Sequence, residues 1–305
     1  MKKYPSYLNL SKIQFLNRIK KAYRFLQSCR LCPHNCGVDR TIGQKGLCRS
    51  TEQLKISSYN VHFGEEPPLS GIYGSGTIFF TNCTLSCVYC QNYPISQLGH
   101  GNITSVSDLS KIMLALQKQK CHNINLVTPT HFVPQIVKAV AQARESGLNI
   151  PLVYNTSGYE SIEALRLLNG IIDIYLPDAK YTNAEISKKY SHAENYPSVI
   201  KNALKEMYRQ VGNLKLNQSG IAVSGMLVRH LVLPNQLSGT EVILKWIADN
   251  ISKETYISLM AQYFPAFQAS EYSELSRRIN RKEYKRARDI LDECGLFNGW
   301  IQQYN

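Results

Sequence analysis

Short apolar segments alternate with longer amphipathic ones along most of the chain, and this alternation restricts the fold more than any other feature. The apolar segments are 78–82, 124–128, 150–155, 171–176, 226–233 and 255–260. Between them, apolar residues recur at helical spacing, as in 107–120 and 241–250. A strand followed by a helix, repeated six times, is typical of a parallel sheet in an α/β fold. Six units are too few for an eightfold barrel, so a doubly wound sheet and an open, partial barrel both remain.

Three parts of the chain differ in pattern. Residues 1–70 are predicted to hold an N-terminal helix and a cysteine-rich segment, and residues around Gly64 to Gly76 are predicted to form a linker. Residues 71–265 contain the six β/α units, and residues 266–305 are predicted to form a C-terminal helical extension. No apolar run is long enough to span a bilayer, and the N-terminus lacks the apolar core of a secretion signal. We therefore expect a cytoplasmic protein.

The positive charge is concentrated in the predicted C-terminal helix. The chain has 35 Lys and Arg against 22 Asp and Glu, a net charge of +13, and 277–288 is its densest basic stretch. Apolar residues interleave with these cations at helical spacing: Ile279, Tyr284, Ala287, Ile290 and Leu291. We expect this stripe to pack against the barrel and leave the cations in solvent or facing an acidic protein, so a nucleic-acid partner is not expected.

Seven of the nine cysteines fall into two groups. The second group, Cys83, Cys87 and Cys90, directly follows the first predicted strand. Three closely spaced thiolates can ligate three irons of a 4Fe-4S cluster and leave the fourth iron open to another ligand. A structural zinc is the alternative, but such sites usually pair two short Cys or His motifs, and no second motif follows here. The spacing therefore favours a catalytic cluster.

The first group has four members, Cys29, Cys32, Cys36 and Cys48, separated by turn-forming residues such as Pro33 and Gly37. Four thiolates suit either zinc or a second iron–sulfur cluster. A metal would stabilise a loop-rich segment that has little apolar core of its own. We expect a metal site of structural character here, and the spacing does not decide which metal it holds.

Polar residues follow most of the predicted strands. They are Asn82, then Thr128, Thr130 and His131, then Asn155 and Ser157, then Asp178 and Lys180, then Arg229 and His230, and finally Gln262 and Tyr263. In a parallel α/β sheet or barrel, the carboxyl ends of the strands form the site. We therefore expect the functional site among these residues.

The cysteine motif, with Tyr89 before its last cysteine, resembles that of the radical S-adenosylmethionine (SAM) superfamily. The segments CRLCPHNCGVDRTIGQKGLC, FFTNCTLSCVYCQNYPIS, NLVTPTHFVPQI and LVRHLVLPN resemble uncharacterised relatives of pyruvate formate-lyase activating enzyme. The resemblance runs from about residue 29 to residue 295. It implies a partial (βα)6 barrel with an N-terminal cysteine-rich extension and a C-terminal helix.

The resemblance also implies an activity and cofactors. In such oxidoreductases, SAM binds the open iron of the 4Fe-4S cluster, and reductive cleavage yields a 5′-deoxyadenosyl radical that abstracts hydrogen from a substrate. A protein or peptide substrate, as in glycyl-radical activases, and a one-electron reductant such as flavodoxin or ferredoxin are the implied partners. The resemblance names no substrate.

Site residues follow from the same resemblance. Many members carry Gly-Gly-Glu-Pro after the second strand, where the backbone meets the methionyl amine of SAM, and this chain has Thr128-Pro129-Thr130-His131 there. Arg229 is a candidate for the SAM carboxylate or ribose, or for a structural salt bridge. Tyr89 is a candidate for stacking near the adenine, or for packing under the cluster loop. Asn155 and Ser157 complete the candidate cofactor residues.

A different class of function remains as the alternative. Zinc at the cysteine groups and a basic C-terminal helix could make a zinc-stapled, non-catalytic nucleic-acid-binding protein. The basic residues are not interleaved with a run of exposed aromatic residues, and six β/α units favour an enzyme scaffold.

Overall fold

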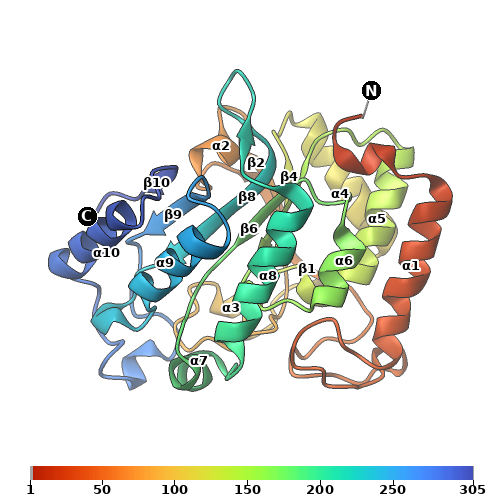
Figure 1. The fold of residues 1–305 in the computed structure, drawn as a ribbon. Coiled ribbons are helices and arrows are strands. Elements are labelled where there is room, and N and C mark those ends of the chain that lie inside the picture. The colour runs from red at the N-terminus through yellow and green to blue at the C-terminus, as the bar shows by residue number, and fades with distance from the viewer. Residues whose placement is uncertain (1–2, 305) are drawn as a thin grey trace.

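The computed structural model describes residues 3–304, which form one curved sheet covered by helices (Figure 1). The strands are β1 (Lys55–His62), β2 (Ser75–Phe80), β3 (Asn102–Ile103), β4 (Ile124–Val127), β5 (Leu152–Thr156), β6 (Ile174–Pro177), β7 (Lys215–Leu216), β8 (Ala222–Leu231), β9 (Tyr256–Met260) and β10 (Gly299–Ile301). The helices are α1 (Lys12–Gln27), α2 (Pro67–Ser70), α3 (Tyr93–Ser96), α4 (Val106–Lys118), α5 (Val133–Glu145), α6 (Ile162–Leu168), α7 (Ala184–Ser191), α8 (Tyr196–Val211), α9 (Thr240–Asn250) and α10 (Arg281–Glu293). None of the helices in residues 3–304 has the length and apolarity needed to cross a membrane.

The order of the strands selects the open, partial barrel. Strands β2, β4, β5, β6, β8 and β9 lie side by side in chain order, and each is parallel to the next. A doubly wound sheet would reverse its order at a switch point, and these six strands show no reversal. The six predicted β/α units are therefore confirmed as a (βα)6 barrel. The polar region predicted as helical over 183–212 contains two helices, α7 and α8, separated where His192 adopts a left-handed backbone conformation.

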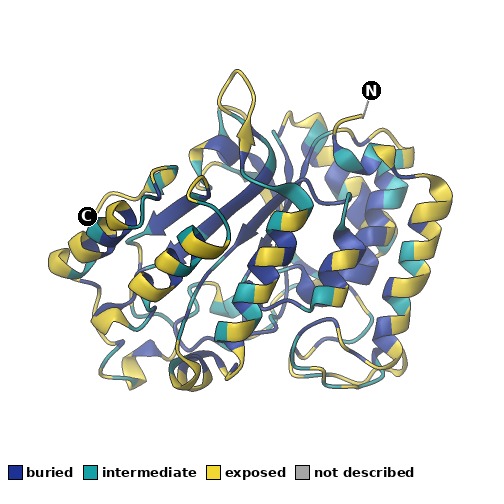
Figure 2. Ribbon diagram, viewed as in Figure 1, coloured by how far each residue is buried: buried dark blue, intermediate teal, exposed yellow. Residues whose placement is uncertain are grey.

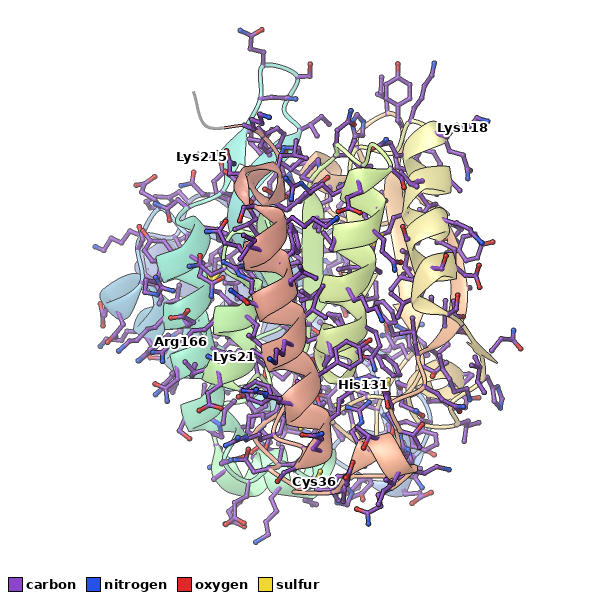
Figure 3. The ribbon with its side chains drawn as sticks, turned by 90° about the vertical axis from the view of Figure 1, so that its right-hand side faces the viewer. Lys21, Cys36, Lys118, His131, Arg166 and Lys215 are labelled. Atoms are coloured by element: carbon purple, nitrogen blue, oxygen red, sulfur yellow. The ribbon has the colours of Figure 1, made fainter. Side chains whose placement is uncertain are left out.

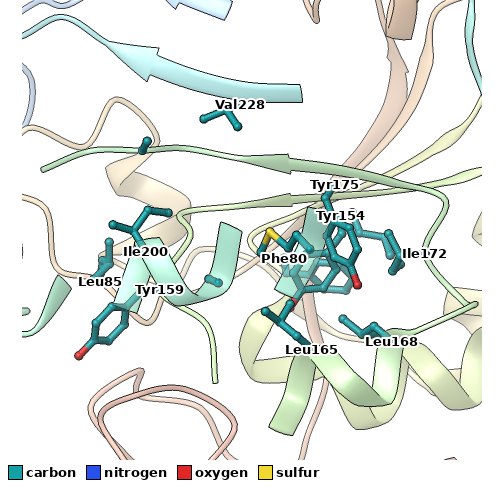
Figure 4. Close-up of a cluster of buried hydrophobic side chains, with 14 of the residues drawn as sticks. Phe80, Leu85, Tyr154, Tyr159, Leu165, Leu168, Ile172, Tyr175, Ile200 and Val228 are labelled. Carbon is teal, nitrogen blue, oxygen red and sulfur yellow. The ribbon is translucent and has the colours of Figure 1, made fainter. Parts of the chain in front are cut away.

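The central strands are buried on both faces, which explains their continuous apolar runs. Every residue of β5 and β6 is buried, and the exposed residues of the helices face outward (Figure 2). Tyr154 and Tyr175 lie together in the core with Phe80 and Leu165 nearby (Figure 4). The hydroxyl of Tyr175 donates to Gln210 Oε1 at 2.7 Å, so the aromatic ring is buried without leaving its polar end unpaired.

The sheet also contains strands that the sequence did not predict. Strand β1 runs antiparallel to β2, and the short strand β3 pairs with β1. Strand β10 is parallel to β9 and extends the other edge. The expected linker before β2 contains the single turn of α2. These additions place 64–67 and the C-terminal strand close to the open side of the barrel.

The C-terminal helix packs as predicted. Tyr284, Ala287, Ile290 and Leu291 of α10 are buried, and its cations remain on the outer face. Several cations pair with carboxylates, including Lys285 with Asp289 at 2.9 Å and Arg286 with Glu293 at 2.7 Å. Arg277, which precedes α10, pairs with Glu283, so three of the seven cations in the basic stretch form ion pairs among residues 3–304, and α10 is an amphipathic helix.

Candidate active site

A cavity of about 220 Å³ lies at the carboxyl ends of the parallel strands. All six barrel strands, or the loops that follow them, contribute to its wall. Its lining includes Cys83, Cys87, Tyr89, Cys90, Thr128, Asn155, Thr156, Ser157, Asp178, Lys180, Arg229, Met260 and Gln262. The structure therefore brings the three cysteines together with at least one polar residue from the end of each of the other five barrel strands. Five of the predicted strand-end residues do not line this cavity: Asn82, Thr130, His131, His230 and Tyr263.

The three cysteines belong to the loop that follows β2, and none forms a disulfide. Each sulfur has a polar neighbour: the Leu85 N–H donates to Cys83 Sγ at 3.3 Å, and the Ser191 hydroxyl donates to Cys87 Sγ at 2.9 Å. Cys90 Sγ lies 3.0 Å from Ser96 Oγ. Such donors stabilise cluster-bound thiolates and tune their potential.

Without a metal, burial makes the thiols of Cys83 and Cys87 poor acids. Burial raises the pKa of Cys83 to about 12 and that of Cys87 to about 11, and Lys180 opposes the shift at both. Iron would compensate the thiolate charge that burial disfavours. Three free thiols on one cavity wall, with N–H and O–H donors beside them, are thus a donor set of the kind that would suit an iron–sulfur cluster.

Arg229 projects into this cavity from β8 and is held by three acceptors. Its Nε donates to Asp178 Oδ1 at 2.7 Å, its Nη2 donates to Asn155 Oδ1 at 2.6 Å, and its Nη1 lies 3.5 Å from Glu65 Oε2. Burial opposes the charge, but the carboxylates of Asp178, Glu66 and Glu65 raise the pKa of Arg229 above its usual value. Its main contacts are thus those of an internal ion pair.

Lys180 is a second cation at the same wall. Its Nζ donates to Asp178 Oδ2 at 2.8 Å, so one carboxylate serves both Lys180 and Arg229. Lys180 also lies close to Cys87. The lysine charge lowers the pKa of the Cys87 thiol, and the Cys87 thiolate raises the pKa of Lys180. The sequence identified Lys180 as a polar strand end but did not assign it to the cofactor. A partly compensated cation beside the cysteines is well placed to bind an anionic group.

The predicted cofactor residues divide into two sets. Tyr89, Thr128, Asn155, Ser157 and Arg229 line the cavity. Thr130 and His131 do not, because both are buried behind the wall. The Thr130 hydroxyl donates to Glu160 Oε1 at 2.6 Å, and His131 Nε2 lies 2.8 Å from the Thr81 carbonyl oxygen. The structure therefore gives these two side chains supporting contacts rather than cavity contacts.

Thr128 has an unusual backbone. Its φ is +58°, a left-handed conformation that β-branched residues rarely adopt. Its N–H donates to the Asn155 carbonyl at 2.9 Å, which holds the turn against β5. Strained backbone of this kind clusters at ligand sites. The chain thus adopts a glycine-like turn at the place where the resembled enzymes carry glycine.

Behind this wall, Glu160 is a buried carboxyl surrounded by hydroxyls. It accepts hydrogen bonds from Thr130, Thr156 and Tyr154, and no lysine or arginine among residues 3–304 forms an ion pair with it. Burial raises the pKa of Glu160 to about 7, although the hydroxyls partly oppose the shift. The group is therefore protonated in the folded protein at a pH where it is ionised in the unfolded chain.

This difference predicts a pH-dependent stability. Because the folded pKa exceeds the unfolded one, the free energy of unfolding should fall as pH rises from about 4.5 to about 7. The contribution is roughly 3 kcal/mol over that range. Glu160→Gln keeps an acceptor for the two threonines, but it cannot titrate. The variant should therefore lack this pH-dependent contribution to the free energy of unfolding. Chemical denaturation of both proteins from pH 5 to 8 checks it, and parallel curves for the two proteins would contradict it.

The four-cysteine segment packs against the loop that carries the cluster cysteines. His34 Nε2 lies 2.8 Å from the Thr84 carbonyl oxygen, and Asn82 Nδ2 donates to Ser50 Oγ at 3.0 Å. Figure 3 shows Cys36 at the same end of the molecule as His131, opposite Lys118 and Lys215. The segment is therefore part of the wall that supports the cavity.

Arg40 connects this segment to the turn after β4. It is 1% exposed, and its guanidinium donates to the carbonyl oxygens of Thr51 and His131, the latter at 2.7 Å. Burial raises the pKa of the Cys29 thiol, and the positive charge of Arg40 partly opposes that shift. Burial also raises the pKa of Cys32, and the other three thiols of the group raise it further, so the four sulfurs are neighbours. A Cβ added to Gly46 would lie 2.5 Å from Cys36 Sγ, so a larger residue there would displace that sulfur.

No group of three or more His, Cys, Asp or Glu side chains in residues 3–304 is arranged to hold a metal ion. A metal at the four cysteines, like a cluster at Cys83, Cys87 and Cys90, therefore stays a prediction. The four free thiols, their mutual proximity and the nearby guanidinium are the features that suit a thiolate-bound metal.

Comparison with known proteins gives concordant results. The profile of the Radical SAM superfamily matches residues 77–221. Uncharacterized protein MJ0674 of Methanocaldococcus jannaschii is 30% identical over 289 residues, which cover 92% of this chain and 78% of that protein. Uncharacterized protein MJ0808 of the same organism is 24% identical over 246 residues, covering 74% of this chain and 68% of that protein.

Solved structures share the fold. Streptococcus suis SuiB bound to S-adenosylmethionine superposes with a TM-score of 0.50 and 11% identity over 73% of this chain. HydG, a maturase of the FeFe-hydrogenase, gives a TM-score of 0.50 and 11% identity over 98% of this chain. The matched part spans 48% of the SuiB chain and 66% of the HydG chain. At these identities, the similarity concerns the fold alone.

Proposed function

Since this chain belongs to the radical SAM superfamily, we propose that Cys83, Cys87 and Cys90 hold a 4Fe-4S cluster at which SAM is reductively cleaved. The observation that carries this proposal is the convergence of three free thiols and the polar strand ends on one cavity. When bound, the cluster would supply the electron that breaks the sulfonium C–S bond of SAM, which starts hydrogen abstraction from a substrate.

The chain's own residues would bind and orient SAM. Lys180, which shares the Asp178 carboxylate with Arg229, would attract the SAM carboxylate. The strained turn at Thr128 would present backbone oxygen to the amine, because it replaces the glycines of the resembled enzymes. Arg229 would chiefly hold Asp178 and Asn155 in position, since its donors are directed to them.

A protein or peptide substrate, as in glycyl-radical activases, is the finer part of the proposal. It rests on the resemblance of the four sequence segments to relatives of pyruvate formate-lyase activating enzyme. A small one-electron donor such as flavodoxin or ferredoxin would reduce the cluster.

We also propose that Cys29, Cys32, Cys36 and Cys48 bind a structural metal, zinc or iron–sulfur. Arg40 supports this because it is a buried cation with no carboxylate ion pair among residues 3–304. Four metal-bound thiolates carry excess negative charge that Arg40 would offset. Through the His131 carbonyl, the metal-bound segment would then hold the turn that lines the cofactor cavity.

The direct test is anaerobic purification of the full chain followed by reduction with dithionite in the presence of SAM. We expect a brown protein that contains iron and sulfide and forms 5′-deoxyadenosine. A colourless protein that binds two zinc ions and forms no 5′-deoxyadenosine after reconstitution would instead support the nucleic-acid-binding alternative.

A further inference from the structure

A second cavity, of about 300 Å³, adjoins the cofactor cavity. The two cavities share Arg229, Met260 and Gln262, so these three residues form the boundary between them. Glu65 and Glu66, between β1 and α2, form one wall of the second cavity, and Trp300 of β10 contributes to the other. A group bound there would lie next to SAM. Its volume is at the lower end of the range for small-ligand sites.

The charges of this cavity are unbalanced. Glu65 has a side chain only 9% exposed, accepts from Asn125 Nδ2 at 3.0 Å and pairs with Arg229 at 3.5 Å. Arg229 makes its shorter contacts with Asp178 and Asn155. The cavity lining thus contains two carboxylates and one guanidinium already engaged by other residues. In a chain of net charge +13, this local excess of negative charge is not a property of the general surface.

Glu66 is the residue of this wall that lacks a hydrogen-bond donor, although the charge of Arg229 acts on its carboxylate. Its Oε2 is buried, and no residue from 3 to 304 donates a hydrogen bond to it. A buried acceptor without a donor destabilises the protein, and does so more strongly when it is charged. A bound ligand with a cationic N–H group would remove that cost.

The rest of the wall suits an alkyl chain. Met260, Trp300 and Ile301 provide apolar contacts, and the Trp300 ring packs against Tyr256 with centroids 5.5 Å apart. Apolar walls accommodate a methylene stem, and the face of an indole ring attracts a cation. The cavity therefore combines the features needed for a lysine or arginine side chain.

We propose that this cavity binds a cationic side chain of the substrate, an ammonium or guanidinium on an alkyl stem, and places it beside the cofactor. The proposal rests on the proposed function for the role of the neighbouring cavity. The Glu66 carboxylate accepts a hydrogen bond from the cationic group, and Trp300 and Met260 contact the alkyl stem. Glu65 pairs with Arg229.

A tryptophan emission titration tests the proposal in the full chain. The sequence contains two tryptophans, and Trp246 lies on α9 beside Lys201 and Lys205, away from this cavity. Trp246→Phe therefore leaves Trp300 as the reporter. The probes are N-acetyl-lysine methylamide and its norleucine and glutamate analogues, and isothermal titration calorimetry measures the same binding independently.

We expect saturable binding of the lysine probe and at least about tenfold weaker binding of the norleucine and glutamate probes. Glu66→Gln should weaken binding of the lysine probe about tenfold or more. Glu271→Gln, which changes an exposed carboxylate elsewhere, should have no effect. Ile301→Lys, at a partly exposed wall position, should also block the lysine probe by adding a cation.

Equal affinity for the lysine and norleucine probes, unchanged affinity in Glu66→Gln, or no emission change and no heat with any probe would overturn the proposal. Formation of 5′-deoxyadenosine without substrate is measured in parallel. If SAM is not cleaved but the lysine probe binds as expected, the proposed function fails and the cationic site stands. If SAM is cleaved and the lysine probe does not bind, only the cationic site fails.

Discussion

Replacing Cys87 with alanine should reduce 5′-deoxyadenosine formation to the level seen without enzyme. The thiol lies on the wall of the cofactor cavity, and its loss removes one of three protein ligands from the proposed cluster. The same result is expected for Cys83→Ala and Cys90→Ala. The measurement is anaerobic SAM cleavage together with iron and sulfide content.

Cys121→Ala provides the matched control for Cys87→Ala. Cys121 is also a buried free thiol, 2% exposed, but it lies outside the cavity and outside both cysteine groups. Its replacement should leave SAM cleavage close to wild type. Full turnover in any of the three cluster variants would refute the assignment of the ligands.

Replacing Cys32 with alanine should lower the melting temperature by about 10 °C, because loss of a structural metal costs on the order of several kcal/mol. Cys32 is buried in a segment built mainly from turns, so packing alone provides little to compensate for a lost metal. Cys87→Ala should affect stability much less, although it abolishes activity. Thermal unfolding of the two variants under anaerobic conditions compares them.

Elemental analysis of the wild-type protein identifies the metal. About one zinc per chain beside four irons would agree with a structural zinc, and roughly eight irons without zinc would identify a second cluster. Equal melting temperatures for Cys32→Ala and wild type would contradict a structural role, whichever metal is bound.

The cysteine segment and the cofactor turn meet at residues that are far apart in sequence. Arg40 and His131 are separated by 91 positions, yet the Arg40 guanidinium reaches the His131 carbonyl oxygen at 2.7 Å. A change at the four cysteines can therefore reach the turn at Thr128 through a single buried side chain. The segment therefore supports the turn beside the cavity, although none of residues 29–48 lines the cavity itself.

The sequence by itself determined the features that depend on neighbouring residues. Cys83, Cys87 and Cys90 lie within eight positions, so any fold brings them close. The apolar runs of β5 and β6 indicated strands buried on both faces, and the helical spacing of Tyr284, Ala287 and Leu291 indicated the inner face of α10. Local periodicity reports which side of an element is buried. Strand β1 was not predicted from the sequence. Only one of its eight residues is buried, so the strand shows no alternation of apolar and polar residues.

Only the tertiary structure decided which distant groups meet. The order of the six parallel strands depends on pairing between segments, so periodicity could not separate the partial barrel from a doubly wound sheet. Thr128 and Thr130 are two positions apart, yet a left-handed turn places one in the cavity and the other against Glu160. Arg229 contacts Glu65, although the two residues are 164 positions apart in the sequence, because the chain after β1 passes the open side of the barrel. Short spacing in the sequence restricts how far apart two residues can lie in the fold. Contacts across the barrel depend instead on strand order and register, which local sequence patterns do not predict.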